Sequence, residues 1–400
     1  MRVLIWASTL QADILALALH LDARPDTELL VAAEGPDAWR RELIARVRPL
    51  RARLLDRAAA GTQAEVMAFR ADVVVCDNHF PEFPAARRVC YLWHGLGWKA
   101  KDAKDIRVGN GHIARLTGLD PQKPNPRLLA QCYHEHDREW RIRSWGYAPE
   151  NCLVAGSCFS DLLLDPPYTR ADLASSYRID VVGRRTLLLN FGWHYGRIFP
   201  GSWQPKCFGR SPVEADLAFI RALFARAEDH GANVLFCLHD RWRYEAAYLD
   251  ALHREAARFP HVEIKHKNER PDNLADLVVA DAWVSNLSSF VTFFYCSGRP
   301  SVHLCPPPGA KLRLSRVTRF GLRARAAEEQ VEWMNQPEDN GGLSAHDATG
   351  ALAAVDRALT EPDCCRERAR QWLENHVDGI DGHASRRLGD TIARLVASER

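Results

Sequence analysis

Long apolar runs are missing from this sequence. No stretch approaches the ~18 residues that a membrane-spanning helix needs, although 46% of the 400 residues are hydrophobic. The first residues also lack the basic segment and the longer apolar segment of a secretory signal peptide. We therefore expect no transmembrane helix and no signal peptide, and the apolar residues are available for a large globular core.

A strong charge of either sign is missing too. The chain has 53 basic and 51 acidic residues, which gives a formal net charge of +2. This balance offers no global attraction for a polyanion, so we expect no nucleic-acid partner.

Several patterns typical of metals, cofactors and disulfides are absent. The eleven cysteines form no C-x-x-C pair, which favours reduced, buried thiols over a disulfide framework or a zinc site. No G-x-G-x-x-G fingerprint follows the first predicted strand, which argues against a nicotinamide cofactor. No D-x-D motif lies at a predicted strand end. We therefore predict no bound metal and no cofactor.

The sequence instead alternates short apolar runs with helical segments. The runs are typical of buried parallel strands, and the segments between them have the apolar spacing of helices. The predicted strands are Met1–Ala7, Leu29–Ala33, Asp72–Asp77, Arg88–Trp93, Cys152–Ala155, Thr186–Leu189, Asn233–Leu238, Val262–Lys265, Ala282–Val284 and Pro300–Leu304. This alternation predicts an α/β protein with parallel sheets.

The alternation is interrupted between Asp165-Pro-Pro167 and Gly183. Because single cores stop growing near ~250–300 residues, we place a domain boundary there. The predicted units are an N-terminal Rossmann-like domain at 1–168, a C-terminal Rossmann-like domain at 184–375, and a C-terminal helix at 376–400 that packs back toward the first domain. The predicted fold class is α/β, with two Rossmann-like domains facing a cleft and a helical C-terminal tail.

Three segments have weaker patterns. Ala38–Arg57 contains seven arginines and an apolar face, and we predict a helix there that Pro49 kinks or splits. Lys99–Lys123 has the composition of a long polar loop. After Pro308 we predict helix to the end of the chain.

Three candidate sites follow predicted strands, where ligands meet parallel sheets. The first is His94-Gly95 with Lys99, in which the glycine lets a substrate approach the backbone. The second is His239. The third is Ser285-Asn-Leu-Ser-Ser289, whose hydroxyls and free N–H groups at a predicted helix N-terminus favour an anion.

Each candidate also has a structural interpretation. A strand-end histidine can be a buried, satisfied imidazole, a serine can simply cap a helix, and Lys99 can be a solvated loop residue. The tryptophans at 193, 203 and 242 can pack in the core or stack on a base or acceptor. The residues alone leave these alternatives open.

Taken in order, the same segments resemble the CDP-glycerol glycerophosphotransferase family of teichoic-acid synthesis. The family's W-H-G-T-P-x-K segment is here Trp93-His-Gly-Leu-Gly-Trp-Lys99, its L-H-P element is Leu238-His-Asp240, and its T-D-Y-S-S element is Ser285-Asn-Leu-Ser-Ser289. Its G-Y-P-R-N-D-x-L turn and its A-P-T-W-R strand end are matched loosely by Gly156–Leu163 and Asn190–Trp193. The resemblance spans Tyr91 to Pro300, and the chain departs from it by losing Thr-Pro after Gly95 and the acid of T-D-Y-S-S.

The resemblance implies a glycosyltransferase-B-like architecture with the donor nucleotide on the C-terminal domain. It also implies a transferase that moves glycerol phosphate, or a related alditol phosphate, from a CDP-activated donor. The acceptor would be a hydroxyl of a cell-surface polysaccharide or of a lipid-linked molecule, and CMP would be released. The chain is identified as a divergent member of that family.

Within that reaction we assign His94 as the base, because imidazole titrates near neutral pH. We assign His239 to hold the phosphate or to protonate the leaving group. The other assignments are donor-phosphate contacts at Ser288, Ser289 and Lys99, and nucleotide or acceptor contacts at Gly95, Trp193 and Asn286.

Three alternatives stay open at this point. The same fold can serve a glycosyltransferase that uses a nucleotide-sugar for surface polysaccharide synthesis. It can also serve a nucleotide-sugar 2-epimerase, or a nucleotide-binding protein without catalysis.

The arginine-rich stretch Ala38–Arg57 bears on location. It can be the solvated face of a surface helix, or it can contact an anionic membrane surface or an anionic acceptor. We therefore expect a cytoplasmic protein that can attach peripherally to the inner face of the cell membrane.

Overall fold

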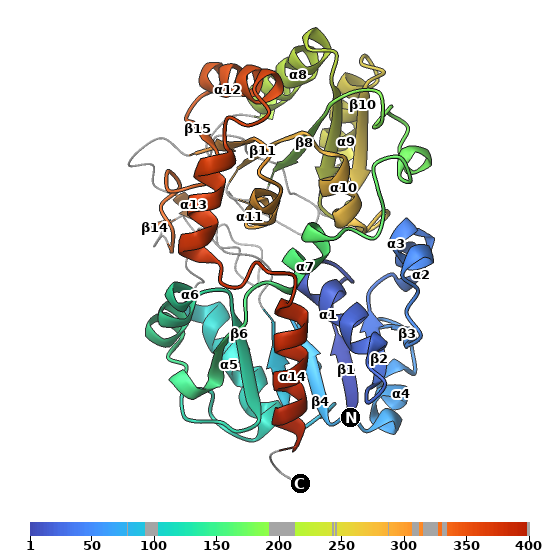
Figure 1. Cartoon of the computed structure of the whole chain (residues 1–400), viewed down its shortest axis with the longest axis vertical. Coiled ribbons are helices and arrows are strands. Elements are labelled where there is room, and N and C mark those ends of the chain that lie inside the picture. The colour runs from blue at the N-terminus through green and yellow to red at the C-terminus, as the bar shows by residue number, and fades with distance from the viewer. Residues whose placement is uncertain are drawn as a thin grey trace.

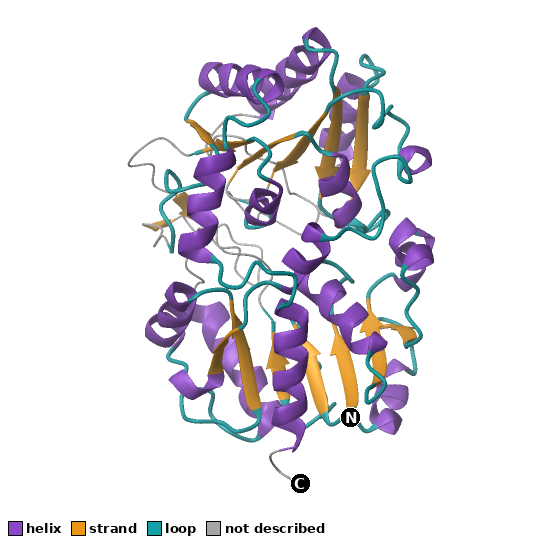
Figure 2. Cartoon of the chain, in the orientation of Figure 1, coloured by secondary structure: helices purple, strands orange, loops and turns teal. Residues whose placement is uncertain are grey.

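The computed structural model describes residues 1–77, 79–92, 103–191, 213–241, 244, 246–286, 288–305, 312–314, 327–329 and 334–397. Two parallel sheets lie in the two halves of the molecule, each flanked by helices (Figures 1 and 2). This arrangement confirms the predicted α/β class with two Rossmann-like halves. We call residues 1–164 the N-terminal lobe and residues 184–376 the C-terminal lobe.

The sheet of the N-terminal lobe has seven parallel strands in the order 3-2-1-4-5-6-7. They are β1 (Arg2–Trp6), β2 (Glu28–Ala33), β3 (Arg53–Asp56), β4 (Val73–Cys76), β5 (Val89–Tyr91), β6 (Leu128–Cys132) and β7 (Cys152–Val154). The helices are α1 (Ala12–Ala23), α2 (Pro36–Arg41), α3 (Leu43–Val47), α4 (Thr62–Phe69), α5 (Ala103–Thr117), α6 (Glu135–Trp140) and α7 (Cys158–Leu164).

The sheet of the C-terminal lobe has six parallel strands in the order β10-β9-β8-β11-β12-β15. Their bounds are β8 (Thr186–Phe191), β9 (Asn233–Leu238), β10 (Val262–His266), β11 (Ala282–Asn286), β12 (Ser301–Leu304) and β15 (Leu343–Ala345), and an antiparallel pair is formed by β13 (Leu312–Leu314) and β14 (Ala327–Glu329). The helices are α8 (Val213–Asp229), α9 (Ala246–Ala256), α10 (Asn273–Val279), α11 (Val291–Phe294), α12 (Ala348–Thr360) and α13 (Arg366–His376).

The central strands are continuous apolar runs because both faces of each sheet are covered. Val3, Leu4 and Ile5 of β1 are fully buried, as are the valines of β4 beside them. Val3 pairs with Val73, and this register continues to the ends of both strands. The carboxyl ends of neighbouring strands therefore lie at one edge of the sheet.

The predicted helix over Ala38–Arg57 is confirmed only up to Val47 and is wrong after Pro49. The segment forms α2 and α3, and then β3, which pairs in parallel with β2. The apolar residues Leu54 and Leu55 lie on this edge strand rather than on a helix face. Helix α3 ends at Val47, because Pro49 disfavours helical backbone at the residue before it and cannot donate a backbone hydrogen bond.

The predicted loop over Lys99–Lys123 is also wrong, because helix α5 occupies much of it. Ile113 and Leu116 are buried on one side of this helix. Packing of that face stabilises a helix even though Gly109 and Gly111 each disfavour one by about 1 kcal/mol. The all-helical region predicted after Pro308 likewise contains the strands β13, β14 and β15 before its helices begin.

The C-terminal helix α14 (Ala384–Ala397) lies against α1 and α7 of the N-terminal lobe (Figure 1). Leu388 and Ile392 are fully buried there, and Arg24 of the lobe pairs with Asp390 at 2.6 Å. Among the described residues, no helix is both long and apolar enough to span a bilayer.

Candidate functional site

The strand order of the C-terminal sheet reverses between β8 and β11. We call this place the C-terminal switch point, because in open α/β sheets ligands bind beyond the strand ends where the order reverses. Asn190 of β8 and Ser285 of β11 meet there, and the Ser285 hydroxyl donates to the Asn190 carbonyl at 2.8 Å. Asn286 follows and is buried. Neutral polar groups thus line both strands that flank the reversal.

Ser288 and Ser289 come directly after this strand end and are partly buried. The N–H of Phe290 donates to the Ser288 hydroxyl at 3.4 Å. The helix that follows is short, because α11 has four residues and a 3₁₀ turn comes next. A helix this short has a small dipole, so any affinity for an anion depends mainly on the hydroxyls and the local N–H groups.

His239 follows β9, the strand on the other side of β8. Strand spacing therefore puts it about 10 Å from the end of β11. Its Nδ1 lies 2.8 Å from the N–H of Asp240 and 2.9 Å from the Asp240 carboxylate. In a neutral ring Nδ1 accepts from the N–H, and in a protonated ring it donates to the carboxylate. Asp240 can therefore hold both protonation states of His239.

The backbone of His239 is held from two directions. Its N–H donates to the Tyr244 hydroxyl at 2.9 Å, and its carbonyl lies 3.3 Å from Nδ1 of His266. Burial lowers the pKa of His266, which favours its neutral form. The imidazole of His239 is about one third exposed, so the side chain can reach a ligand from a fixed backbone.

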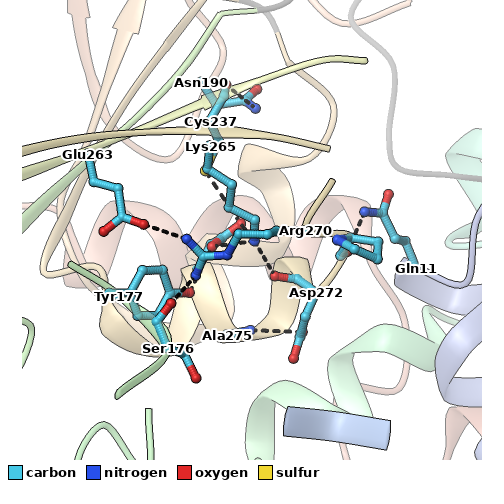
Figure 3. A network of polar contacts seen from close by, with 12 residues as sticks. Gln11, Ser176, Tyr177, Asn190, Cys237, Glu263, Lys265, Arg270, Asp272 and Ala275 are labelled. Atoms are coloured by element: carbon cyan, nitrogen blue, oxygen red, sulfur yellow. Dashed lines mark hydrogen bonds and ion pairs between the residues drawn. The ribbon is translucent and has the colours of Figure 1, made fainter. Parts of the chain in front are cut away.

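A buried network supports the strand end that carries His239 (Figure 3). Lys265 of β10 donates to both carboxylate oxygens of Asp276 at 2.7 Å. Asp276 also accepts from the Cys237 thiol at 3.4 Å, and the Cys237 carbonyl accepts from Asn190 at 3.4 Å. Burial opposes the charge on Lys265, but the Asp276 carboxylate outweighs it with help from its neighbours, and the pKa of Lys265 is raised. The network joins β8, β9, β10 and α10.

The same network holds the segment at the predicted domain boundary. The Tyr168 hydroxyl donates to Asp272 at 2.8 Å, and the Tyr177 hydroxyl donates to Asp276 at 2.8 Å. Arg270 contacts the carbonyl of Ser176 (Figure 3). Asp272 caps α10, with its carboxylate accepting from the N–H of Ala275. Residues 165–183 are thus attached to the C-terminal lobe.

Several residues assigned from the sequence lie outside the described residues. They are His94, Gly95, Lys99 and Trp193. Strand β5 ends at Tyr91, just before the first of them. The structure places Asn286, Ser288 and Ser289 at the end of β11, beside β8 with Asn190, and it places His239 at the end of β9, on the other side of β8. The roles of all these residues stay predictions.

Sequence reasoning missed polar residues at other strand ends. Asn190 was included only in a loose motif, and Asp77 and His79 were passed over at the end of β4. The sequence did indicate this position, because Asp77 is a polar residue that directly follows the apolar run Val73–Cys76. Within the described part of the chain, no three histidine, cysteine or acidic side chains gather in a way that could hold a metal.

Comparisons with known proteins give matches in structure but not in sequence. No family model and no curated protein matches the chain. A structure of the wall teichoic acid polymerase TagF is 14% identical, with a TM-score of 0.64, and covers 100% of this chain and 90% of its own. A TagF variant structure with CDPG gives a TM-score of 0.65 at 13% identity, covering 100% and 89%.

Other solved structures match at a similar level. S. aureus MnaA in complex with UDP is 12% identical with a TM-score of 0.59, and the match covers 99% of this chain and 96% of that one. The UDP-GlcNAc 2-epimerase of Neisseria meningitidis, bound to UDP-GlcNAc, is 12% identical with a TM-score of 0.59 and covers 98% and 100%. The resemblance to glycerophosphotransferases is thus confirmed in fold, and the chain has the two-domain, glycosyltransferase-B-like fold that these enzymes share.

Proposed function

We propose that the protein is a transferase that moves glycerol phosphate, or a related alditol phosphate, from a CDP-activated donor to a hydroxyl acceptor. The acceptor is a cell-surface polysaccharide or a lipid-linked precursor. The observation that carries the proposal is the C-terminal switch point, where Ser285 bonds to Asn190, and where Asn286, Ser288 and Ser289 follow at the same strand end, on a fold shared with a wall teichoic acid polymerase. Uncharged hydrogen-bond donors at the place where the strand order reverses are well placed to bind a diphosphate.

The proposed reaction is a single displacement. The acceptor oxygen forms a bond to the β-phosphorus of the donor, and the bond from that phosphorus to the CMP oxygen breaks. CMP leaves with the electron pair, and a base takes the hydroxyl proton. Ser288 and Ser289 donate to the pyrophosphate of the donor, including the phosphate that stays on CMP, and His239, held by Asp240, donates to the leaving phosphate when protonated.

The proposal keeps the sequence-based roles of the N-terminal residues. His94 accepts the hydroxyl proton, Lys99 neutralises phosphate charge, and Gly95 and Trp193 contact the nucleotide or acceptor. The expected effect of His94→Ala is loss of transfer with retained CMP binding. Turnover within about tenfold of wild type, equivalent to ~1.4 kcal/mol, would remove His94 from the role of base.

The first experiment is a panel of donors and nucleotides. Thermal shift with CMP, CDP, UDP and GDP shows which nucleotide binds, because a ligand at ~100 times its dissociation constant stabilises by about 2.7 kcal/mol. Release of CMP from CDP-glycerol or CDP-ribitol supports the proposal. Release of UDP or GDP from a nucleotide-sugar would replace it with a glycosyltransferase. No response to any nucleotide would favour a scaffold without catalysis.

A second candidate function comes from the epimerase neighbours. A nucleotide-sugar 2-epimerase changes a soluble sugar without any acceptor. The two classes are separated by incubating the protein with UDP-GlcNAc alone and analysing the sugar product. Conversion in the absence of acceptor would establish the epimerase, and an unchanged sugar together with CMP release would support the transferase.

The serines are tested with a matched control. The double variant Ser288→Ala/Ser289→Ala is expected to weaken CMP binding, because two hydroxyl donors are lost. The control is Ser175→Ala/Ser176→Ala in the segment that joins the lobes, where Ser176 contributes its backbone carbonyl. Equal CMP affinity in both double variants would remove the phosphate contact from these serines.

Membrane contact is part of the same proposal. Four of the seven arginines between 40 and 57 are ion-paired, with partners Asp37, Asp22, Glu65 and Glu34. Arg41, Arg46 and Arg48 are exposed, and we propose that these three meet an anionic bilayer surface on the cytoplasmic side. Their triple glutamine variant is expected to lose binding to anionic vesicles. The control replaces Arg357, Arg366 and Arg370 at α12 and α13 with glutamine. Equal vesicle binding by the two triple variants would rule out Arg41, Arg46 and Arg48 as the membrane-binding surface.

A further inference from the structure

The turn after β9, residues 239–241, is joined to the loop after β10, residues 266–270. The two strands are parallel neighbours in the C-terminal sheet. Beyond their ends, the N–H of Arg241 donates to the side-chain oxygen of Asn268 at 2.9 Å. The guanidinium of Arg241 also pairs with the carboxylate of Glu269 at 3.2 Å. The loop after β10 therefore holds the far end of the turn.

The near end of the turn is held by His266, the last residue of β10. Its Nδ1 lies 3.3 Å from the His239 carbonyl, and a carbonyl only accepts, so Nδ1 carries the proton. The His266 ring is buried and packs edge-on against the Tyr244 ring, with 6.2 Å between centroids. Tyr244 in turn accepts from the His239 N–H at 2.9 Å. One packed cluster thus binds both backbone groups of His239.

Burial alone gives no reason for an imidazole at position 266. Within the described part of the chain, Nε2 of His266 has no hydrogen-bond partner, and neither has Nε2 of His253, whose ring lies 6.3 Å away on α9. A buried imidazole with one unpaired nitrogen is less favourable than an apolar ring of similar size. What the imidazole supplies, and an apolar ring does not, is the hydrogen bond to the His239 carbonyl.

The direction of the His239 side chain follows from this backbone. Its imidazole is about one third exposed, and Asp240 engages Nδ1, which leaves Nε2 for a ligand. A proton donor acts over roughly 3 Å, and a displacement of about 1 Å can lower a rate by about 10²-fold. The bonds that fix the turn therefore bear directly on what His239 can do.

We propose that His266 and Asn268 are positioning residues, which fix the turn so that Nε2 of His239 points at the phosphate that leaves with CMP. The inference rests on the proposed transfer reaction, in which His239 donates to that phosphate. It adds two residues to which that function gives no role. Both act through the backbone of the turn, and neither touches the substrate.

The first test replaces His266. In His266→Phe, kcat for CMP release from CDP-glycerol is expected to fall by about 10- to 100-fold. KM is expected to change little, because the donor-binding serines lie on another strand. His266→Asn keeps a side-chain N–H near the position of Nδ1 and is expected to restore most of the rate.

The control for His266 lies at the other end of β10. His261 directly precedes this strand, is also buried, and has its Nε2 3.0 Å from the Phe224 carbonyl. His261→Phe therefore removes an equivalent buried contact away from the turn, and its kcat is expected to stay near that of the wild type. A kcat of His266→Phe within about threefold of wild type, or equal losses in the two phenylalanine variants, would overturn the role of His266.

Asn268 gives a test on an exposed side chain, whose replacement leaves the core intact. Asn268→Ala removes the acceptor of the Arg241 N–H. Its kcat is expected to fall by about 2- to 10-fold, the equivalent of one neutral hydrogen bond, with little change in KM. Asn268→Asp keeps an acceptor oxygen and is expected to restore the rate. An unchanged kcat in Asn268→Ala, or a loss that Asn268→Asp does not restore, would remove Asn268 from the positioning role.

A measurement without substrate separates this inference from the proposed function. If the wild type releases no CMP from any CDP-alditol, the proposed function fails. The position of His239 is then read from its imidazole ¹⁵N and ¹H resonances, because Nδ1 contacts Asp240. These resonances are expected to shift in His266→Phe and to keep their wild-type positions in His261→Phe. Identical His239 resonances in the wild type and in His266→Phe would overturn the positioning.

Discussion

At the scale of single residues, Asp13 shows how burial sets the chemistry of a side chain. Its carboxylate accepts from the Tyr133 hydroxyl, and it accepts from the Ser157 hydroxyl and the Phe159 N–H at 2.7 Å each. Burial raises its pKa from 3.8 to about 6, although these three hydrogen bonds act in the opposite direction. Asp13 thus links α1 to the end of β6 and to α7.

The raised pKa of Asp13 predicts a pH dependence. The unfolded carboxyl ionises near pH 3.8 and the folded one near pH 6, so its contribution to stability is fully present below pH 3.8 and is lost as pH rises through about 6. The lost part is about 3 kcal/mol, since one pKa unit corresponds to about 1.4 kcal/mol. Asp13→Asn is expected to lack this decline. Urea unfolding of the wild type and of Asp13→Asn on both sides of pH 6 measures this decline in stability. Stability curves of the two proteins that run parallel with pH would contradict the prediction.

The buried pair of Lys265 and Asp276 leads to a second prediction at this scale. Lys265→Met leaves the Asp276 carboxylate buried without its cation, which typically costs about 3–5 kcal/mol. The double variant Lys265→Met/Asp276→Leu is expected to be more stable than the single one, because no charge is left uncompensated. Denaturant unfolding of both variants tests this. A double variant that is less stable than the single one would show that other partners of Asp276, such as Tyr177, dominate.

At the scale of elements, the turn between β7 and α7 depends on Gly156. Its φ is +75°, and a Cβ at this position would overlap the backbone carbonyl of Asp378, in the segment that leads into α14. The turn and the returning chain therefore pack backbone against backbone. Only glycine combines this φ with such a close approach.

Gly156→Ala is therefore expected to destabilise the fold strongly. The positive φ alone costs about 1–2 kcal/mol, and displacement of the backbone near Asp378 adds to it. Gly382→Ala is the matched control, because Gly382 has the same φ of +75° but a Cβ added there would meet nothing within 4 Å. The difference in free energy of unfolding between the two variants measures the close approach. Equal losses would mean that the segment at Asp378 moves aside freely.

The element scale also explains the two wrong helix and loop predictions. Leu54 and Leu55 have a spacing that suits either a helix face or an edge strand, and pairing with β2 decides for the strand. Helix α5 was missed because its glycines and polar residues indicate a loop, whereas burial of Ile113 stabilises a helix. In both cases a partner distant in sequence overrides the local pattern.

At the scale of the whole molecule, one apolar cluster joins the two lobes. Phe159 of α7 contacts Phe290, which precedes α11, and Phe293 within α11, at 5.7 and 5.1 Å between ring centroids. The cluster continues through Trp283 and Tyr295 of the C-terminal lobe. Residues that follow Ser288 and Ser289 are thus packed directly against the N-terminal lobe.

This shared cluster predicts cooperative unfolding. Calorimetry of the intact chain is expected to show a single transition, because neither lobe can unfold without exposing the other's apolar surface. Leu388→Ala on α14 is expected to cost about 2–5 kcal/mol and to lower the midpoint of that one transition, whereas Arg394→Ala, on the same helix, is expected to change little. Two resolved transitions, with only one shifted by Leu388→Ala, would show that the lobes unfold independently.

The sequence by itself determined the α/β class, the two Rossmann-like halves and the strand ends at His239 and Ser285. These follow from local physics, because strands buried on both faces must be apolar runs and polar residues mark where each run stops. A family resemblance in a few segments then selected the fold that the structural neighbours share.

Only the tertiary structure decided which strand ends are neighbours. Strand order is set by pairing between segments tens of residues apart, and no local pattern records it. That order places Asn190 beside Ser285 and Ser8 beside Asp77, and so defines two switch points that the sequence cannot reveal. The chemistry of each side chain is local, but its place in a site depends on long-range packing.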